Sequence, residues 1–225
     1  MATTTFHNAK RIQESVLSDC EKRVLTWLAQ RMPAAINSDH LTLLGLLAMI
    51  GAAASYWYAN VNPVTGLTLA TVCLVINWFG DSLDGTLARV RNKLRPRYGF
   101  YVDHVVDMLG MLCLVSGLAL SGYMSATVSA ALLIVYFMLS IDCYLATYTL
   151  GKFRLSFAGF SPTELRIVLG VGNAFLIFRP DVILFGERFL LFDVGGVIGA
   201  LGMAAVLVYS VARNAARLYR EEPLS

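Results

Sequence analysis

Long runs of apolar residues alternate with short polar segments along most of the 225-residue chain. Six runs stand out, each near the ~20 residues that a helix needs to cross a bilayer. They cover residues 41–60, 65–88, 100–121, 124–148, 164–178 and 193–213. This pattern predicts an all-α integral membrane protein whose six transmembrane helices form one bundle over residues 40–215.

The segment before the first run has a mixed pattern. In residues 9–32, apolar side chains (Ile12, Val16, Val24, Leu25, Trp27 and Leu28) lie among basic ones (Lys10, Arg11, Lys22, Arg23 and Arg31). Such a mixture predicts an amphipathic helix that lies on the membrane surface. The alternative is an ordinary solvated helix that leads into the first span.

Composition supports the membrane class. The chain is 57% hydrophobic and has a mean hydropathy of +0.63, values that exclude a soluble core wrapped in polar surface. A single membrane domain accounts for residues 1–225 and leaves no room for a second globular unit. The four cysteines are scattered singly, without a CxxC or Cys/His cluster, so neither a thiolate metal site nor a disulfide framework is expected.

Four aspartates interrupt the second and third runs. They occur in the order Asp81-x-x-Asp84-Gly85-x-x-Ala88-Arg89, nine residues, Gly99-x-x-x-Asp103-x-x-x-Asp107. A carboxylate at membrane depth is costly, and four close together would also repel one another unless a cation sits among them. Spacings of three and four place each pair on one face of its helix. Two such helices side by side would form an all-oxygen cage suited to Mg²⁺ or Mn²⁺.

Small and basic residues adjoin these carboxylates. Gly85 and Ala88 leave room for a ligand to approach, and Arg89 can reach a phosphate or hold an aspartate in place. Metal-binding carboxylates, small residues and basic groups are what a nucleotide pyrophosphate requires. Phosphoryl transfer then depends mainly on charge neutralisation and an in-line nucleophile.

The basic residues are distributed asymmetrically. Nearly all fall in four segments: the N-terminal segment, residues 89–97, residues 152–154 and residues 213–220. Only Arg179 and Arg188 fall on the other side. The positive-inside rule predicts that both termini and the opening of the aspartate site face the cytoplasm. The net charge is only +3, but a basic face suits lipid headgroups and phosphates, and nothing indicates nucleic acid binding.

The segment from Asp81 to Asp107 resembles the signature of the CDP-alcohol phosphotransferases, D-x2-D-G-x2-A-R-x(8 or 9)-G-x3-D-x3-D. All eight fixed positions match, and the spacer has the longer of its two lengths. The six-run layout is also similar to this family. The resemblance implies a phospholipid-biosynthesis enzyme that transfers a substituted phosphate from a CDP-linked alcohol to a hydroxyl acceptor and releases CMP. It also implies a homodimer.

The resemblance further implies roles for individual residues. The ligands of Mg²⁺ or Mn²⁺ would be Asp81, Asp84, Asp103 and Asp107. Asp107 would also be the base that takes the proton of the acceptor hydroxyl, since its position matters more than its intrinsic basicity. The nucleotide would contact Asp81, Gly85, Ala88, Arg89 and Thr42.

The start of the first run departs from the family pattern. Family members usually have Pro-Asn-x-x-Thr there, whereas this chain has Ser38-Asp39-His40-Leu41-Thr42. An ionised aspartate accepts hydrogen bonds but donates none, which leaves the first-span contact to the nucleotide open. The alternative role for Asp39 is to cap the first span.

Candidates for contact with the acceptor or a phosphate lie outside the signature, at Lys152, Arg154, Arg166, Glu164 and His104. The three basic residues would bind a phosphate together or, alternatively, snorkel at the interface. Glu164 lies in a stretch similar to the start of the fifth span of family members. His104 follows Asp103 as in the choline- and ethanolaminephosphotransferases, where it would be a second proton acceptor; a structural role is the alternative.

Three functions compete. The favoured one is the enzyme, with CDP-diacylglycerol and a small water-soluble alcohol as substrates, or alternatively CDP-choline or CDP-ethanolamine with diacylglycerol. A divalent-cation transporter would need polar residues that continue to the far leaflet, but residues 65–75 and 109–120 contain no charge. A structural membrane subunit would leave the eight matched positions to chance.

Overall fold

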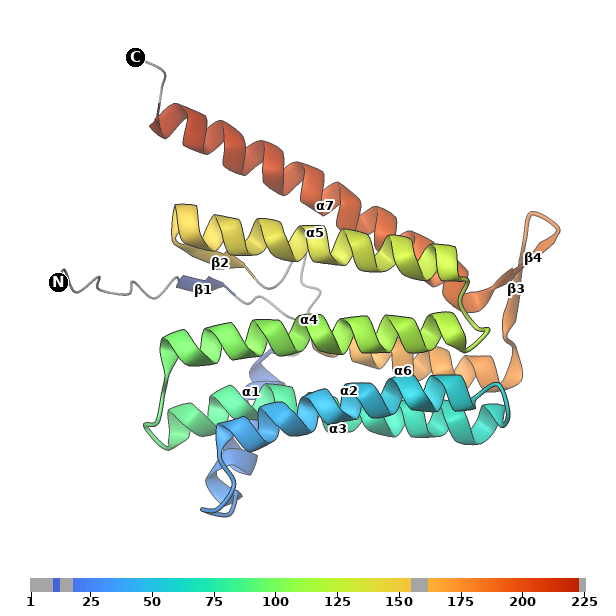
Figure 1. The fold of residues 1–225 in the computed structure, drawn as a ribbon, viewed down its shortest axis with the longest axis horizontal. Helices are drawn as coiled ribbons and strands as arrows, with labels where there is room; N and C mark the ends of the chain where they lie inside the picture. The colour runs from blue at the N-terminus through green and yellow to red at the C-terminus, as the bar shows by residue number, and fades with distance from the viewer. Residues whose placement is uncertain (1–9, 13–17, 155–161, 223–225) are drawn as a thin grey trace.

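The computed structural model of the chain describes residues 10–12, 18–154 and 162–222. It is a bundle of helices with two very short sheets (Figure 1). The helices are α1 (Ser18–Arg31), α2 (Ser38–Tyr58), α3 (Pro63–Val90), α4 (Pro96–Leu120), α5 (Ala126–Leu150), α6 (Pro162–Phe178) and α7 (Leu191–Glu221). From α2 onward, successive helices run back and forth along the long axis of the molecule.

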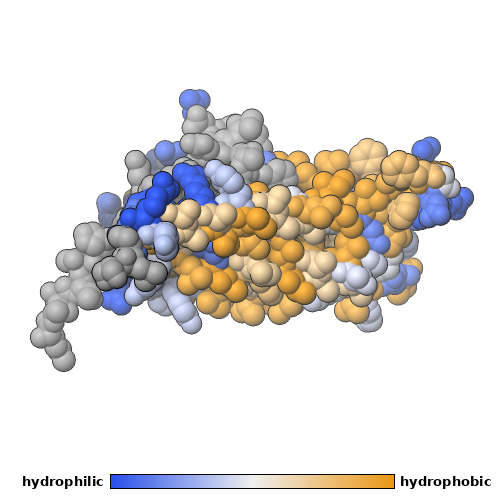
Figure 2. Space-filling view, turned by 90° about the horizontal axis from the view of Figure 1, so that it is seen from above, coloured by the Kyte–Doolittle hydropathy of each residue, from blue (hydrophilic) through white to orange (hydrophobic). Residues whose placement is uncertain are grey.

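Five helices (α2, α3, α4, α5 and α7) are long and apolar enough to cross a membrane. Figure 2 shows a broad apolar surface between more polar ends, as expected of such a protein. The all-α membrane class is therefore confirmed. Helix α6 has 17 residues, or about 25 Å at 1.5 Å per residue, so the count of six spans stays a prediction at this helix.

Of the described residues of the N-terminal segment, Ser18–Arg31 are helical. Lys10–Ile12 form strand β1, which pairs in parallel with strand β2 (Lys152–Arg154). The expectation of a helix over residues 9–32 is therefore wrong for residues 10–12; residues 13–17 lie outside the described part of the chain. The reason is a partner strand far along the sequence, whose backbone hydrogen bonds no local pattern reveals.

A β-hairpin that the apolar pattern does not predict joins α6 to α7. Strand β3 (Asp181–Leu184) pairs antiparallel with β4 (Glu187–Leu190). Between them Phe185 and Gly186 have φ angles of 54° and 87°. Positive φ at both central residues is the conformation of a tight hairpin turn whose twist matches that of the strands.

The residue that caps the start of helix α2 is Asn37, not Asp39. The Asn37 side chain accepts a hydrogen bond of 3.1 Å from the backbone N–H of His40. The role of Asp39 as the cap is thus wrong, because a residue two positions earlier already supplies the side-chain oxygen that the helix start needs. Asp39 instead forms an ion pair with Arg95, just before α4.

Close backbone approach fixes α2 against α3 and α4. A Cβ atom at Gly80 would lie 2.5 Å from the carbonyl oxygen of Leu41, and one at Gly117 would lie 2.4 Å from Cα of Ala53. Small residues permit this approach, which increases van der Waals contact between helices where no hydrophobic effect drives their association. Helices α2, α3 and α4 therefore form the most tightly packed part of the bundle.

A buried polar network joins α6 to this group. The hydroxyl of Tyr56 donates to Asn173 Oδ1 at 2.9 Å, and the Asn173 amide donates to Thr71 Oγ1 at 3.0 Å. Tyr56 and Asn173 are almost fully buried. Polar groups in apolar surroundings need such partners, so the network fixes α6 in register with α2 and α3.

Helices α5 and α7 form a more open pair on one side of α4 (Figure 1). Ser210 of α7 donates a hydrogen bond of 2.5 Å to Asp142 of α5. Of the described residues of α5, only Ser129 is buried. One face of α5 is exposed at Ile134, Met138, Ile141, Leu145 and Tyr148, and is available to lipid or to another protein chain.

One end of the bundle brings the basic segments together. Strand β1, helix α1, the α3–α4 linker and the end of α7 all lie there, opposite the hairpin that follows Arg179 (Figure 1). The fold thus places the two ends of the described chain on the same side, in line with the charge distribution. That this side faces the cytoplasm stays a prediction.

Gly80→Ala should destabilise the protein, because the added methyl group would overlap a backbone carbonyl that cannot turn away. We expect a loss of about 1–3 kcal/mol, as for overpacking of a tight core, measured by thermal unfolding in detergent. Gly202→Ala is the matched control, since a Cβ there meets no atom within 4 Å. Equal unfolding temperatures for both variants would contradict this account of the α2–α3 contact.

Candidate metal and phosphate site

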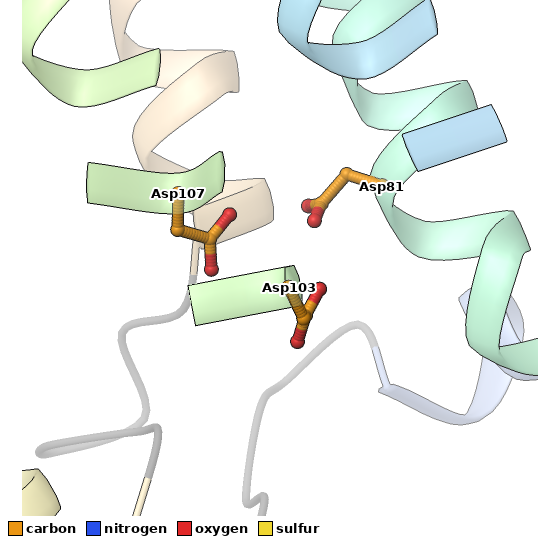
Figure 3. Close-up of side chains that lie close together, drawn as sticks. All are labelled: Asp81, Asp103 and Asp107. Atoms are coloured by element: carbon orange, nitrogen blue, oxygen red, sulfur yellow. The ribbon is translucent and has the colours of Figure 1, made fainter. Parts of the chain in front are cut away.

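Three carboxylates converge between α3 and α4. Asp81 comes from α3, and Asp103 and Asp107 come from successive turns of α4 (Figure 3). One ligand oxygen from each lies within 4.8 Å of the others. A short linker joins the two helices and makes them antiparallel, so the aspartate-bearing faces that the spacing predicts do meet.

Asp84 lies on α3 one turn beyond Asp81 and has its own partners. Thr42 Oγ1 of α2 donates to Asp84 Oδ2 at 2.6 Å, and Ser38 Oγ donates to the Asp84 carbonyl at 2.8 Å. Asp84 also accepts a hydrogen bond from the Gly85 N–H. The predicted set of four aspartates is thus arranged as a group of three plus Asp84, which is held by the start of α2.

A cavity of ≈ 70 Å³ connects these groups. This volume is several times what one water molecule needs. Its described polar lining consists of Thr42, Asn77, Asp81, Asp84, Asp103, Asp107, Tyr136 and Arg166. Toward the middle of the bundle the lining becomes apolar, at Met49, Leu74 and Leu114. Among the lining residues that the structure describes, charged groups therefore do not continue toward the far end, as a transport pathway would require.

Arg166 brings a positive charge into the array from α6. Its Nη2 donates to Asp81 Oδ2 at 2.5 Å, and its Nε donates to Asn77 Oδ1 at 2.8 Å. The Asn77 amide in turn donates to the carbonyl oxygen of Gly45 at 3.0 Å. The Arg166 side chain is 14% exposed, and its buried Nη1 has no hydrogen-bond partner among the described residues. The guanidinium is thus fixed in place with one donor edge left for a ligand.

The donor set fits a hard divalent cation. With all three carboxylates ionised and Arg166 as the one described guanidinium paired with them, the group would carry an excess of negative charge in a partly buried setting. Asp81, Asp103 and Asp107 offer only oxygen ligands, which is the chemistry that Mg²⁺ and Mn²⁺ prefer. These three residues could hold a metal ion, with Asp84 close by in the same cavity.

The small residues of the signature border open space beside this cavity. A Cβ atom at Gly85 or at Gly99 would meet no other atom within 4 Å. Ala88 is half-buried, and Arg89 is exposed and donates to Thr86 Oγ1 at 3.0 Å. Gly85, Ala88 and Arg89 therefore form an accessible strip along α3, between the carboxylates and the end of the helix.

The remaining candidates are placed differently. His104 is only 9% exposed, stacks on Phe100 with ring centroids 4.2 Å apart, and meets Tyr144 edge-on. Neither His104 nor Glu164, in the first turn of α6, belongs to the described cavity lining. Lys152 and Arg154 lie on β2, but their side chains are outside the described part of the structure.

Two lining residues escaped the sequence pattern. Asn77 orients Arg166. A polar amide within an apolar run is unusual, so Asn77 could have been found from the sequence as a candidate site residue. Tyr136 reaches the cavity from α5, but one tyrosine in a membrane helix gives no such signal. The contact between Arg166 and Asp81 joins positions 85 residues apart and depends on how α6 packs.

Comparison with known proteins agrees with this geometry. The family described as CDP-alcohol phosphatidyltransferase matches residues 36–208. An archaetidylinositol phosphate synthase of Pyrococcus horikoshii is 25% identical over 77% of this chain and 76% of its own length. Its namesake from Methanothermobacter thermautotrophicus is 33% identical over 50% of this chain and 54% of its own. A CDP-diacylglycerol–serine O-phosphatidyltransferase of Encephalitozoon cuniculi is 31% identical over 53% of this chain and 32% of its own length.

The chain belongs to the CDP-alcohol phosphatidyltransferase family. It is thus a membrane enzyme, a transferase of substituted phosphate groups, and the resemblance carried by the aspartate signature is confirmed. The family match does not support the transporter and structural-subunit hypotheses.

Arg166→Gln should destabilise the metal-free protein, because it leaves the three carboxylates without their fixed counter-charge. A fully buried pair broken on one side costs about 3–5 kcal/mol; since this pair is partly exposed, we expect about 2 kcal/mol, read from thermal unfolding in chelator. Added Mn²⁺ should stabilise this variant more than the wild type, since binding to the folded state raises stability.

The control for this prediction is Arg217→Gln, which breaks an exposed ion pair with Glu221 and should have little effect. Unfolding of Arg166→Gln at the wild-type temperature in chelator would show that the guanidinium does not offset the carboxylates.

Proposed function

We propose that the enzyme transfers the phosphatidyl group of a CDP-linked glycerolipid, of the CDP-diacylglycerol type, to the hydroxyl of a small water-soluble alcohol and releases CMP. The observation that supports this most is the group of Asp81, Asp103 and Asp107, whose oxygens lie within 4.8 Å of one another. They stand in the signature segment, beside an accessible strip on α3. Metal-binding carboxylates next to an open surface at Gly85 and Ala88 suit a nucleotide pyrophosphate.

The donor would lie along α3. Gly85 has open space around it, so the cytidine and ribose could approach the helix closely beside Ala88. Arg89 is exposed near the end of this strip and would reach a phosphate oxygen. Thr42 would contribute to nucleotide binding indirectly, because its hydroxyl orients the carboxylate of Asp84. The lipid chains of the donor would extend into the bilayer.

Asp107 would be the base. It shares the cavity with the other carboxylates and would take the proton of the acceptor hydroxyl as that oxygen attacks the phosphorus next to the lipid. A divalent cation held by Asp81, Asp103 and Asp107 would supply charge neutralisation on the pyrophosphate. The metal would be Mg²⁺ or Mn²⁺, and CMP would leave with the electrons of the broken P–O bond.

Arg166 would bind a phosphate on the acceptor. Its Nε and Nη2 are already engaged, and its buried Nη1 faces no described hydrogen-bond partner. Two similar proteins are named as makers of archaetidylinositol phosphate, a product that carries a phosphate on the alcohol. We therefore favour a phosphorylated alcohol, with Lys152 and Arg154 as further candidates at the edge of the site and Glu164 beside them.

The choline- and ethanolaminephosphotransferase alternative is less well supported. It would use His104 as a second proton acceptor, but the ring is packed between Phe100 and Tyr144. A third similar protein is named for CDP-diacylglycerol and serine, which also favours a CDP-linked lipid donor. We further propose that the site opens to the cytoplasm and that the exposed surface of α5 contributes to a homodimer.

Purified enzyme in lipid, given Mn²⁺ or Mg²⁺, CDP-diacylglycerol and inositol phosphate, should release CMP, and a chelator should stop the release. Glycerol phosphate, serine and unphosphorylated inositol serve as competing acceptors in the same panel. CMP formed only from CDP-choline or CDP-ethanolamine with diacylglycerol would reverse the choice of donor.

Asp107→Asn should lower turnover by at least about 100-fold, the usual range for loss of a general base, while the protein stays folded. Asp142→Asn is the matched control, because it also neutralises a carboxylate within a membrane helix but lies away from the cavity, beside Ser210. Turnover by Asp107→Asn at the Asp142→Asn rate would remove Asp107 from the mechanism.

A further inference from the structure

The carboxylate of Glu21, on the surface helix α1, is bound between two helices of the bundle. Its Oε1 accepts a hydrogen bond of 2.7 Å from the indole N–H of Trp78 on α3 and one of 2.9 Å from Thr163 Oγ1 on α6. Ser82 Oγ lies 3.5 Å from the same oxygen. One carboxylate oxygen thus connects three helices that are distant in sequence.

These contacts lie next to the proposed active site. Trp78 is three residues before Asp81 on α3, and Thr163 is three residues before Arg166 on α6. Asp81 and Arg166 form the ion pair inside the aspartate group. Because three residues make almost one helical turn, Glu21 bonds to α3 and to α6 within about one turn of the two residues that form the ion pair.

The rest of α1 is anchored along the same stripe. Leu25 and Ala29 follow Glu21 at intervals of four and are 7% and 3% exposed. They pack with Leu83 and Leu87 of α3. Val24 and Trp27, on the other side, are 43% and 53% exposed. Helix α1 therefore faces the bundle with Glu21 and with apolar residues that include Leu25, Leu28 and Ala29, and Glu21 also contacts α6.

We propose that Glu21 is a positioning residue that fixes the spacing of α3 and α6 at the aspartate site, so that Asp81 meets Asp103 and Asp107 in a geometry able to bind a cation. Helix α6 begins at Pro162, and its N-terminal end attracts a carboxylate through the helix dipole, which adds to the two hydrogen bonds. The inference rests on the proposed metal site. It assigns to α1 a part in the chemistry besides its predicted contact with the membrane surface.

The test measures Mn²⁺ binding to the full-length protein without substrates, from the loss of the free Mn²⁺ electron paramagnetic resonance signal. Glu21→Ala should raise the Kd for Mn²⁺ about tenfold, the lower range for loss of a residue that orients metal ligands. Glu21→Gln keeps an oxygen acceptor and should stay within about threefold of wild type. Leu25→Ala is the matched control, since it loosens α1 but leaves the carboxylate in place, and should keep near wild-type affinity.

A double variant tests the route of the effect. If Glu21 acts through α6, adding Thr163→Val to Glu21→Ala should weaken Mn²⁺ binding little further, because the two residues share one interaction. Full additivity would overturn the proposal. If Glu21→Ala does not fold, Thr163→Val alone should raise the Kd severalfold, and unchanged affinity would overturn the proposal.

Two further outcomes distinguish this inference from the proposed function. Wild-type Mn²⁺ affinity in Glu21→Ala, or an equal loss in Leu25→Ala, would overturn the positioning role while leaving the metal site intact. Failure of the wild-type protein to bind Mn²⁺ at all would overturn the metal site itself, and the positioning role with it.

Discussion

Mutual repulsion among carboxylates inside an apolar bundle is the constraint on which the site depends. Asp81, Asp103 and Asp107 approach within 4.8 Å of one another, where charges in a partly buried setting interact strongly. Arg166 offsets part of this charge through its 2.5 Å contact with Asp81, and a bound cation would offset the rest. The electrostatic free energy of the three carboxylates is thus tolerable only in a fold that holds a guanidinium group beside them.

The need to position the Arg166 guanidinium explains much of the packing around α6. Asn77 holds Arg166 by its Nε and is itself held by the Gly45 carbonyl of α2. About two turns further along α6, Asn173 joins Tyr56 and Thr71. The two polar networks fix the position and rotation of α6 against α2 and α3. In a helix of 17 residues, these directional hydrogen bonds define the register more sharply than the apolar contacts of Leu169, Leu176 and Ile177 do.

The sequence predicted those features that depend on local spacing. Intervals of three and four residues placed the aspartates on common helix faces, and the short linker between the second and third runs brought these faces together. Features that depend on distant partners were not predictable in the same way. The pairing of Lys10–Ile12 with β2, the Arg166–Asp81 contact and the three helices that meet at Glu21 all arise from tertiary packing. The cap of α2 is an intermediate case, because Asn37 and Asp39 are both suitable residues and only the local backbone selects Asn37.

Helix α3 shows why the signature residues are so closely grouped. One face packs against α1 and α2 through Gly80, Leu83 and Leu87. A second face presents Asp81 to the cavity, and a third leaves Gly85 open. Successive side chains on a helix point about 100° apart around its axis. Neighbouring residues of α3 therefore face three different surroundings within two turns. Any shift of α3 along its axis would therefore disturb packing, metal ligands and the nucleotide strip together, which is the physical reason to expect that contacts fixing α3 from outside, such as that of Glu21, affect the chemistry.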